Sequence, residues 1–413
     1  MHATAPTLPP HRKLCTDCGL SRTAEPKRCA QACQFIQPDY PRFEQSVQGR
    51  TRNLANDELF FGPHQAMWQA WLEPAQSQAQ WSGIATGLAQ ALLEANLVDA
   101  VIAVQAKAND RWAPEPVVIT DAAQMARCRG MRMGYAPLLA EIEPALAAGH
   151  KRLAVIGIPC QVYPLRAIEA SLRQDHGLVE LFVIGIPCSD NTTTEHFHRF
   201  LSLLSQQPEQ IEYLEFRADY QVELRETGGR VRLIPFLNLP ISQLPDDFFP
   251  LTCRTCVDYT NVLSDITVGY MGGRGQQWLV VRNAQGQRML DLLRPRLSLR
   301  AVSSAGNRDS AVRGFLANTE RAAGGLPLRR MPAWLRPVVN WLMPRIGPRG
   351  LEFARARVEM KAIETVLHLQ RHVPARMAHM VPAHVWSIAQ RYGLRATPAR
   401  AVAPPIPLPS ESA

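Results

Sequence analysis

Eight of the nine cysteines fall into two groups whose spacing suits a metal centre. The first group is Cys15-x2-Cys18 followed by Cys29-x3-Cys33, in a segment with few apolar residues. Such a segment has little core of its own and would gain its order from a bound metal. Four thiolates suit a zinc ion and an iron–sulfur cluster about equally. The spacing therefore predicts a metal centre and leaves its identity open.

The second group combines Cys253-x2-Cys256 with Cys160 and Cys188. The sequence Val-Ile-Gly-Ile-Pro-Cys occurs at 155–160 and again at 183–188, with a helical pattern between the two copies. Strand, helix and strand form a βαβ unit, which places its parallel strands side by side with their carboxyl ends at one edge. We therefore expect Cys160 and Cys188 to be near neighbours, at the edge where open α/β sheets bind ligands. The alternative is that both are buried apolar thiols.

Strands and helices alternate through the region that would position these thiols. Residues 83–97 have helical periodicity and residues 98–104 form an apolar, β-branched run typical of a strand. Residues 349–372 are a long candidate helix. The predicted fold class is therefore α/β, in a mixed α+β arrangement with a helix-rich C-terminal region.

The composition describes a globular chain with an uneven charge. Its 413 residues are 46% apolar and 20% charged, and no run approaches the ~20 apolar residues of a membrane-spanning helix. The start, 1–13, lacks the apolar region of a secretory signal, so we expect a cytoplasmic protein. Residues 288–400 hold 19 Arg and one Lys against six acidic residues. This basic region suits an acidic partner or an anionic membrane surface, and no groove-reading module points to nucleic acid.

Several motifs together resemble a known family. Gly157-Ile-Pro-Cys-Gln161, Cys253-x2-Cys256-x-Asp258 and the run 264–272 are similar to the beta subunit of deazaflavin-reducing hydrogenases. Further motifs resemble one branch, the ferredoxin-dependent 8-vinyl reductases of divinyl chlorophyllide a and their plant relative, 7-hydroxymethyl chlorophyll a reductase. These motifs lie at 15–19, 49–53, 58–64, 79–84, 187–191, 280–283 and 350–355. Only five residues separate Gly272 from Trp278, a short connection that favours the vinyl reductases.

The resemblance implies an electron relay. Ferredoxin supplies one electron at a time, whereas reduction of the 8-vinyl group to ethyl needs two electrons and two protons, so FAD would collect the electrons. The resemblance assigns one 4Fe-4S cluster to Cys15, Cys18, Cys29 and Cys33, and a second to Cys160, Cys188, Cys253 and Cys256. Composition divides the chain into an N-terminal cysteine segment (1–74), a central body (75–299), a basic helical region (300–400) and a disordered tail (401–413), and the resemblance implies an iron–sulfur cluster in the first and FAD with the second cluster in the catalytic body.

Other residues are candidates for the flavin and the proton. The helix start at Trp81, Ser82 and Gly83, and the glycine-rich turn that contains Gly272, suit the pyrophosphate of FAD. Polar residues that adjoin the cysteines could bind the flavin or cluster sulfurs, or could simply be turn and cap residues; these are Gln161, Asn191 and Asp258. The proton could come from solvent or from one of three side chains, His64, Tyr259 and Tyr270.

Two alternatives stay open. Within the family, the substrate could be 7-hydroxymethyl chlorophyll a or a deazaflavin. In a different class, the chain could be a zinc-organised binding protein that docks an acidic partner through its basic region. Peripheral contact with a photosynthetic membrane and homo-oligomer formation also stay open. For the tetrapyrrole, Trp334 and Trp341 are suitable aromatic types, with the protein core as their ordinary alternative.

Overall fold

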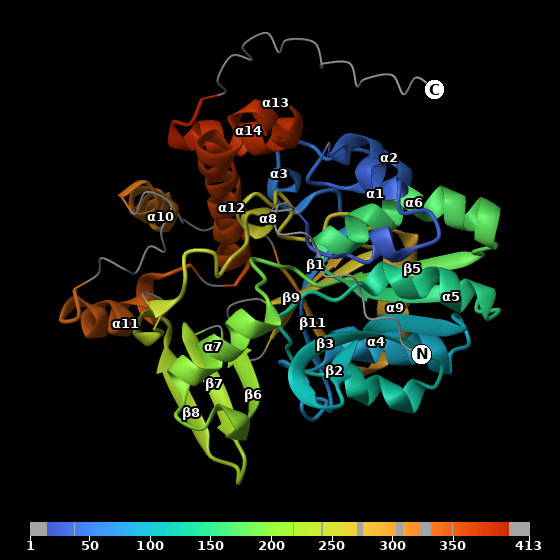
Figure 1. Cartoon of the computed structure of the whole chain (residues 1–413), viewed down its shortest axis with the longest axis horizontal. Coiled ribbons are helices and arrows are strands. Elements are labelled where there is room, and N and C mark those ends of the chain that lie inside the picture. Colours follow the sequence, from blue (N-terminus) through green and yellow to red (C-terminus); the bar gives the residue numbers. More distant parts are fainter. Residues whose placement is uncertain are drawn as a thin grey trace, which may run out of the picture.

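The computed structural model describes residues 15–36, 38–217, 219–240, 243–270, 276–302, 309–321, 332–348 and 350–395 (Figure 1). Within these residues an eight-stranded mixed sheet forms the centre of the molecule, in the order β11-β1-β10-β9-β5-β4-β2-β3. Its strands are β1 (Ala66–Leu72), β2 (Ala100–Lys107), β3 (Asp110–Ile119), β4 (Arg152–Gly157), β5 (Glu180–Gly185), β9 (Ile266–Tyr270), β10 (Gln277–Val281) and β11 (Leu297–Ala301). The mixed α/β class expected from the sequence is therefore confirmed.

The parallel part of the sheet contains the expected βαβ unit. Strand β4 pairs with β5 in parallel, in a register that places Gly157 opposite Gly185. Helix α6 (Pro159–His176) connects the two strands, and β2 and β9 extend the parallel part on either side. Both faces of these strands are covered, which explains why they are apolar without alternation. The prediction that the strands before Cys160 and Cys188 end side by side is confirmed.

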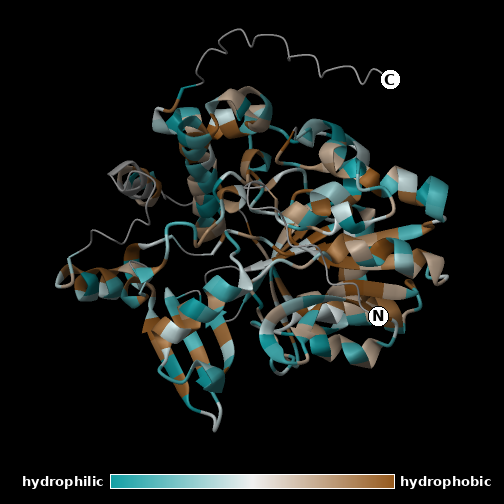
Figure 2. Cartoon of the chain, viewed as in Figure 1, coloured by the Kyte–Doolittle hydropathy of each residue, from teal (hydrophilic) through white to brown (hydrophobic). Residues whose placement is uncertain are grey.

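Helices cover both faces of the sheet. On one face α4 (Ile84–Glu94) and α9 (Ala284–Leu293) pack against strand residues such as Ala154 and Ile184. On the other face α6 packs against Val155 and Val183, together with α1 (Arg28–Ala32), α2 (Tyr40–Gln48) and α5 (Ile142–Ala147). Figure 2 shows the resulting concentration of hydrophobic residues along the central strands.

A small antiparallel sheet stands apart from the large one, at the lower left of Figure 1. It consists of β6 (Ile211–Phe216), β7 (Gln221–Glu226) and β8 (Val231–Pro235). Helix α7 (Thr194–Leu204) shares its core through Phe197 and Leu201. Two short helices belong to the loops around the thiols, α3 (Glu58–Phe61) and α8 (Leu251–Arg254). Short 3-10 helices are η1 (Leu20–Arg22), η2 (Ala122–Cys128), η3 (Leu138–Glu141), η4 (Pro208–Gln210), η5 (Phe236–Asn238), η7 (Arg294–Arg296), η9 (Pro374–Arg376) and η10 (Gln390–Tyr392).

The C-terminal region is helical, as expected. It contains α10 (Asp309–Arg321), α11 (Leu335–Ile346), α12 (Leu351–His372), α13 (Met377–Met380) and α14 (Ala383–Ala389). The long helix α12 begins two residues after the predicted start, behind Gly350, whose φ is 56°. No helix of the described ranges is both long and apolar enough to cross a membrane. The tail at 401–413 lies outside the described residues.

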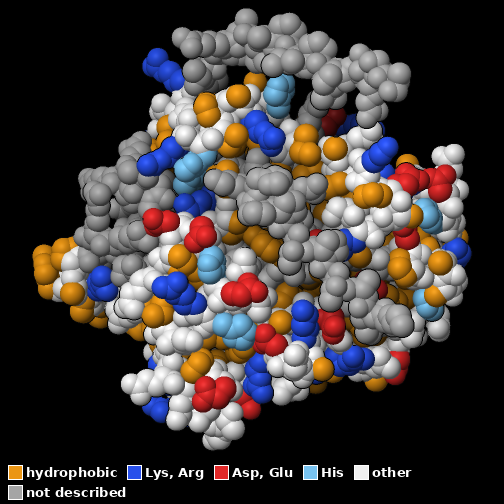
Figure 3. All heavy atoms as spheres, in the orientation of Figure 1, with side chains coloured by type: hydrophobic (Ala, Val, Ile, Leu, Met, Phe, Trp, Pro, Cys, Tyr) orange, Lys and Arg blue, Asp and Glu red, His pale blue; other side chains and the backbone are white. Residues whose placement is uncertain are grey.

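Trp334 and Trp341 lie on the surface beside and within α11, 74% and 61% exposed. Their ordinary alternative, a place in the core, is therefore wrong. Figure 3 shows hydrophobic side chains gathered at the edge of the molecule where α11 lies. The helix turns its other face to η5, where Asn340 bonds to Leu237 and Asn238.

The large sheet crosses the domain boundaries predicted at residues 74 and 299, because it contains strands from the regions before and after each boundary. Strand β1 precedes the first boundary and lies between β10 and β11. Strand β11 spans the second boundary. The N-terminal thiol segment and the central body are therefore linked by main-chain pairing close to the site.

Candidate functional site

The first four thiols share one cavity. Cys15, Cys18, Cys29 and Cys33 line it together with Cys160. Helix α1 positions two of them, because Cys29 lies in its first turn and Cys33 follows its last residue. The walls between the thiols are largely apolar and include Leu20, Phe35 and Pro164.

Burial favours the neutral thiol at two of these residues, Cys18 and Cys33, when nothing is bound to them. It raises the pKa of Cys18 to about 12 and that of Cys33 to about 11, and the neighbouring thiols add to both shifts. A ligand that binds thiolate would therefore have to supply the positive charge that the protein lacks here.

The second four thiols meet at the carboxyl edge of β4 and β5. Cys160 opens α6 directly after β4, and Cys188 follows β5 at the same edge. Helix α8 and the residues after it bring Cys253 and Cys256 to them. Burial, and then the charge of the other three thiols, raises the pKa of Cys160 well above its ordinary value. The paired ends of β4 and β5 bring Cys160 and Cys188 close together, as expected.

The two thiol groups adjoin each other. Cys160 belongs to the second group by its electrostatic partners and also lines the cavity of the first. Gln34 lines that cavity too, and its Nε2 donates to Cys256 Sγ at 3.9 Å. Tyr135 lies between the groups, since burial and the charges of Cys253, Cys160 and Cys15 all raise its pKa.

The donor set fits an iron–sulfur cluster in each group. Each group offers four thiols that are partly or fully buried, and beside the second group the hydroxyls of Tyr135 and Thr252 face each other and have no further partner among the described residues. Unsatisfied donors beside thiolates suit cluster sulfurs, which accept hydrogen bonds. Among all the residues that the structure describes, no group of three or more His, Cys, Asp or Glu side chains is arranged so that it could hold a single metal ion.

Lys361 is a buried cation that sequence reasoning missed. Its Nζ lies 3.0 Å from Asp190 Oδ1 and 3.1 Å from Glu364 Oε2, and it donates to the carbonyl oxygen of Cys253. Asp190 also contacts Arg357 Nη2 at 3.4 Å. The signal in the sequence was a single lysine on the apolar face of α12, which the helix pattern alone does not distinguish from a surface lysine.

The polar residues that adjoin the cysteines are largely held by the backbone. Gln161 accepts from the Ile158 amide at 3.1 Å and donates to the Ala136 carbonyl at 3.0 Å, which is a capping role at the start of α6. The Asn191 side chain bonds to Gly134, while its own amide donates to Cys253 Sγ at 3.2 Å. An amide donor to a ligand sulfur is the kind of contact that tunes a cluster.

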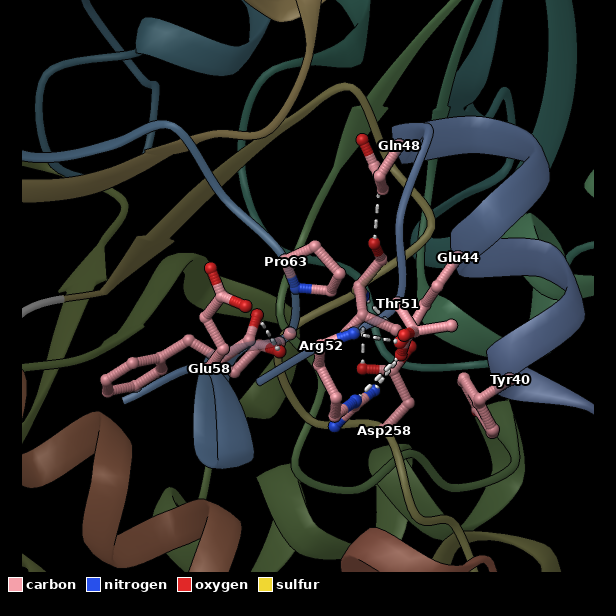
Figure 4. Close-up of polar contacts among 12 residues, drawn as sticks. Tyr40, Glu44, Gln48, Thr51, Arg52, Glu58, Pro63 and Asp258 are labelled. Carbon is pink, nitrogen blue, oxygen red and sulfur yellow. Dashed lines mark hydrogen bonds and ion pairs between the residues drawn. The ribbon is translucent and has the colours of Figure 1, made fainter. Parts of the chain in front are cut away.

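Asp258 belongs to a buried charged cluster behind Cys256 (Figure 4). Arg52 Nε donates to Glu44 Oε1 at 2.7 Å, and the Arg52 amide donates to Glu44 Oε2 at 3.0 Å. Burial raises the pKa of Asp258 to about 6, although the positive charges of Arg282 and Arg52 oppose the shift. Both Asp258 carboxylate oxygens accept from the Val262 amide, at 3.2 and 3.1 Å. The cluster therefore fixes the loop that follows the second thiol group.

The predicted flavin residues at the start of α4 make internal contacts. Ser82 is fully buried, and its hydroxyl donates to Gln277 Oε1 at 2.9 Å and accepts from the Leu72 amide at 3.1 Å. The Ile84 amide also donates to Gln277 Oε1, at 3.2 Å. Gly83 has a φ of 87°, and the Trp81 amide donates to Glu215. Gln277 therefore occupies two of the donors at the helix start that a pyrophosphate would need, so Ser82 and the Ile84 amide do not fit FAD in this arrangement. Gly272 lies outside the described residues.

The three proton-donor candidates are spread over the site. Tyr259 is buried beside the second thiol group, where its carbonyl accepts from the Cys188 amide at 3.1 Å and burial raises its pKa to about 12. His64 has Nδ1 3.0 Å from the Gly62 carbonyl oxygen, and burial lowers its pKa. Tyr270 ends β9, and its side chain lies outside the described residues. Of the three, the described contacts bring Tyr259 to the thiols.

Comparison with known proteins supplies the relatives of this arrangement. Residues 67–143 and 150–304 match the N-terminal and C-terminal parts of the coenzyme F420 hydrogenase/dehydrogenase beta subunit. The chain is 36% identical to the uncharacterised protein all1601 of Nostoc sp., over 93% of this chain and 95% of that protein. It is 35% identical to the chloroplastic 7-hydroxymethyl chlorophyll a reductase of Oryza sativa, over 93% of this chain and 83% of the plant protein.

More distant similarity reaches the hydrogenases themselves. The chain is 23% identical to the coenzyme F420 hydrogenase beta subunit of Methanothermobacter thermautotrophicus, over 61% of this chain and 92% of that protein. Among solved structures, a chain of the F420-reducing [NiFe] hydrogenase complex from Methanosarcina barkeri superposes with a TM-score of 0.52. That match has 21% identity and covers 59% of this chain and 84% of the other, so it supports the fold alone.

Proposed function

This chain belongs to the family of coenzyme F420 hydrogenase/dehydrogenase beta subunits, which are oxidoreductases, and we propose that it reduces the 8-vinyl group of 3,8-divinyl chlorophyllide a to ethyl with electrons from ferredoxin. The observation that carries the redox part of the proposal is the pair of adjoining four-thiol groups, which share Cys160 as a common wall. Adjacent groups of this kind suit two 4Fe-4S clusters that pass single electrons.

The residues of the site have distinct tasks in this proposal. Cys15, Cys18, Cys29 and Cys33 hold one cluster, and Cys160, Cys188, Cys253 and Cys256 hold the other. FAD, when bound, would supply two-electron chemistry. Because the Ile84 amide and the Ser82 hydroxyl already donate to Gln277, we place no flavin contact at these two groups. Tyr259 is the proton-donor candidate that the described contacts place beside Cys188, and its raised pKa of about 12 means that it would give up its proton only to a strongly basic reaction intermediate.

The substrate follows from two observations of different kinds. A plant relative that spans nearly the whole chain is named as a chlorophyll a reductase, which supports a tetrapyrrole substrate. The connection from Gly272 to Trp278 is short, which favours the vinyl group over the hydroxymethyl group. The basic region at 288–400 supports acidic ferredoxin as the partner, and the same charge suits peripheral contact with a photosynthetic membrane. The proposal extends to a homo-oligomer of this chain.

The first experiment measures what the purified protein holds. Protein prepared without oxygen should contain about eight iron atoms, matching sulfide and one FAD per chain. Cys18→Ser and Cys253→Ser should each remove about four iron atoms, while Cys128→Ser, the matched control at the ninth cysteine, should leave the iron content unchanged. Zinc without iron or flavin would overturn the proposal in favour of a zinc-organised binding protein.

The second experiment measures the substrate. With reduced ferredoxin, the protein should convert 3,8-divinyl chlorophyllide a to its monovinyl form and should leave 7-hydroxymethyl chlorophyll a and oxidised deazaflavin unchanged. Turnover of 7-hydroxymethyl chlorophyll a alone would assign the activity of the rice relative instead. Turnover of the deazaflavin alone would place the chain functionally with the F420 hydrogenase relatives.

A further inference from the structure

Two buried charges of opposite sign stand beside the second thiol group. The Lys361 side chain is 3% exposed and the Asp190 side chain 16% exposed, and Nζ lies 3.0 Å from the Asp190 carboxylate. The ammonium also donates to the carbonyl oxygen of Cys253, one of the four proposed ligands. The pair is thus held against the backbone that carries the thiol.

Both charges act on the thiols. Asp190 is among the influences that raise the pKa of Cys188, Cys253 and Cys256, and Lys361 lowers the pKa of the same three. No lysine or arginine is among the strongest influences on Cys18 or Cys33 in the first group. Fixed charges of both signs therefore act on the thiols of the second group.

Burying an ammonium costs several kcal/mol unless it is paired and hydrogen-bonded. A pair formed only to stabilise the fold could lie anywhere along α12. Here the pair lies where a cluster gains negative charge on reduction. A nearby cation stabilises the reduced cluster and raises its reduction potential, and a nearby carboxylate does the opposite.

We propose that Lys361 raises, and Asp190 lowers, the reduction potential of the cluster held by Cys160, Cys188, Cys253 and Cys256. The inference rests on the proposed function, because it requires both clusters and reduced ferredoxin as the electron source. In the step concerned, one electron leaves the electron source, which is oxidised, and enters this cluster, which is reduced. No bond forms or breaks and no proton moves.

The test is a redox titration of the full chain with both clusters, followed by electron paramagnetic resonance. The signal that remains in Cys18→Ser identifies the second cluster. Lys361→Met should lower the midpoint potential of that signal by at least 59 mV, a tenfold change in the one-electron equilibrium. Asp190→Asn should raise it, and the other signal should stay where it is in both variants.

Two variants separate charge from packing. Lys361→Arg keeps the charge. The midpoint potential of the second cluster should therefore stay close to the wild-type value, and the one-electron equilibrium constant should change by no more than a few-fold. Lys151→Met removes a lysine that also donates to backbone carbonyls, those of Leu146 at 2.8 Å and His176 at 2.9 Å, but lies away from the thiols. It should move neither signal. Iron and sulfide are measured for every variant, so that loss of a cluster is not taken for a shift.

The outcomes divide clearly. Shifts of the same sign in Lys361→Met and Asp190→Asn, or no shift with iron intact, would overturn the inference and leave the proposed function standing. If Lys361→Met does not fold, an unchanged potential in Asp190→Asn has the same force. Wild-type protein without iron would overturn both, and the metal analysis alone would show it.

Discussion

At the scale of single residues, Asp265 ties three elements together below the thiols. Its Oδ1 accepts from Arg166 Nη2 and from Asn283 Nδ2, each at 2.7 Å, and its Oδ2 accepts from the Val183 amide at 2.6 Å. Arg166 lies in α6 and Val183 in β5, and Asp265 itself precedes β9. The carboxylate is buried and nearly saturated, so this one side chain aligns the strand ends that carry the thiols.

Replacing Asp265 with Ala should lower the free energy of unfolding by about 3–5 kcal/mol, because three buried donors, on Arg166, Val183 and Asn283, lose their acceptor at about 1–3 kcal/mol each, although Arg166 keeps its salt bridge with Glu169. Urea unfolding followed by circular dichroism measures the loss. Asp291→Ala is the matched control, since Asp291 is exposed and accepts from Gln287 on the same helix, so it should change stability by less than about 0.5 kcal/mol. A loss as small in Asp265→Ala as in the control would contradict the role given to this carboxylate.

At the scale of elements, α12 and α14 close the side of the site opposite the sheet. The apolar face of α12 packs against Phe60 of α3, and α14 brings His384 against Tyr40 of α2, with ring centroids 5.7 Å apart. Burial lowers the pKa of His384 well below its ordinary value, and the charge of Arg52 adds to the effect. The folded protein therefore favours the neutral imidazole of His384.

This burial makes stability depend on pH in one direction. The unfolded chain takes up a proton at His384 as the pH falls through about 6.5, and the folded chain does not. Stability from this group is complete above that value, and about 1.4 kcal/mol is lost between pH 7.5 and 5.5. His384→Phe should flatten the pH dependence of the urea midpoint by this amount, while the exposed His379→Phe should leave it unchanged. An equal slope in wild type and His384→Phe would count against the buried neutral imidazole.

At the scale of the whole molecule, the N-terminal thiol segment is the part with the least core of its own. Residues 15–36 contain only the short η1 and α1 among their described elements, and they rest on α6 and η3. The large sheet, in contrast, is buried between helices on both faces. We therefore expect order in the segment to depend in part on what its thiols bind.

Removal of the metal by a chelator under anaerobic conditions should thus act locally. We expect amide hydrogen exchange in residues 15–36 to become at least tenfold faster, because the free energy of cluster binding no longer orders the segment. The strands β4 and β5 should keep their protection. Uniform loss of protection through the sheet would mean that the clusters hold the entire fold together.

Local patterns determined several features of this protein without any structure. The repeated strand motif specified the βαβ unit and the adjacent ends that carry Cys160 and Cys188, because the chirality of such a crossover leaves little freedom. The helical period over 349–372 likewise specified α12 within two residues. Each of these rests on contacts or hydrogen bonds between residues close in the sequence.

Tertiary structure alone decided the rest, because burial and charge depend on what arrives from elsewhere in the chain. Lys361 has the sequence context of any helical lysine, and only packing against the loop of Cys253 makes it a buried cation. Ser82 does not cap the helix that follows it, which begins at Ile84 behind Gly83, because Gln277 from a strand 195 residues away occupies its hydroxyl and the Ile84 amide. The common wall of the two thiol groups at Cys160 arises in the same way, since the N-terminal segment folds back onto α6. Spacing in the sequence groups the thiols into two sets of four, but the distance between the sets is a property of long-range packing.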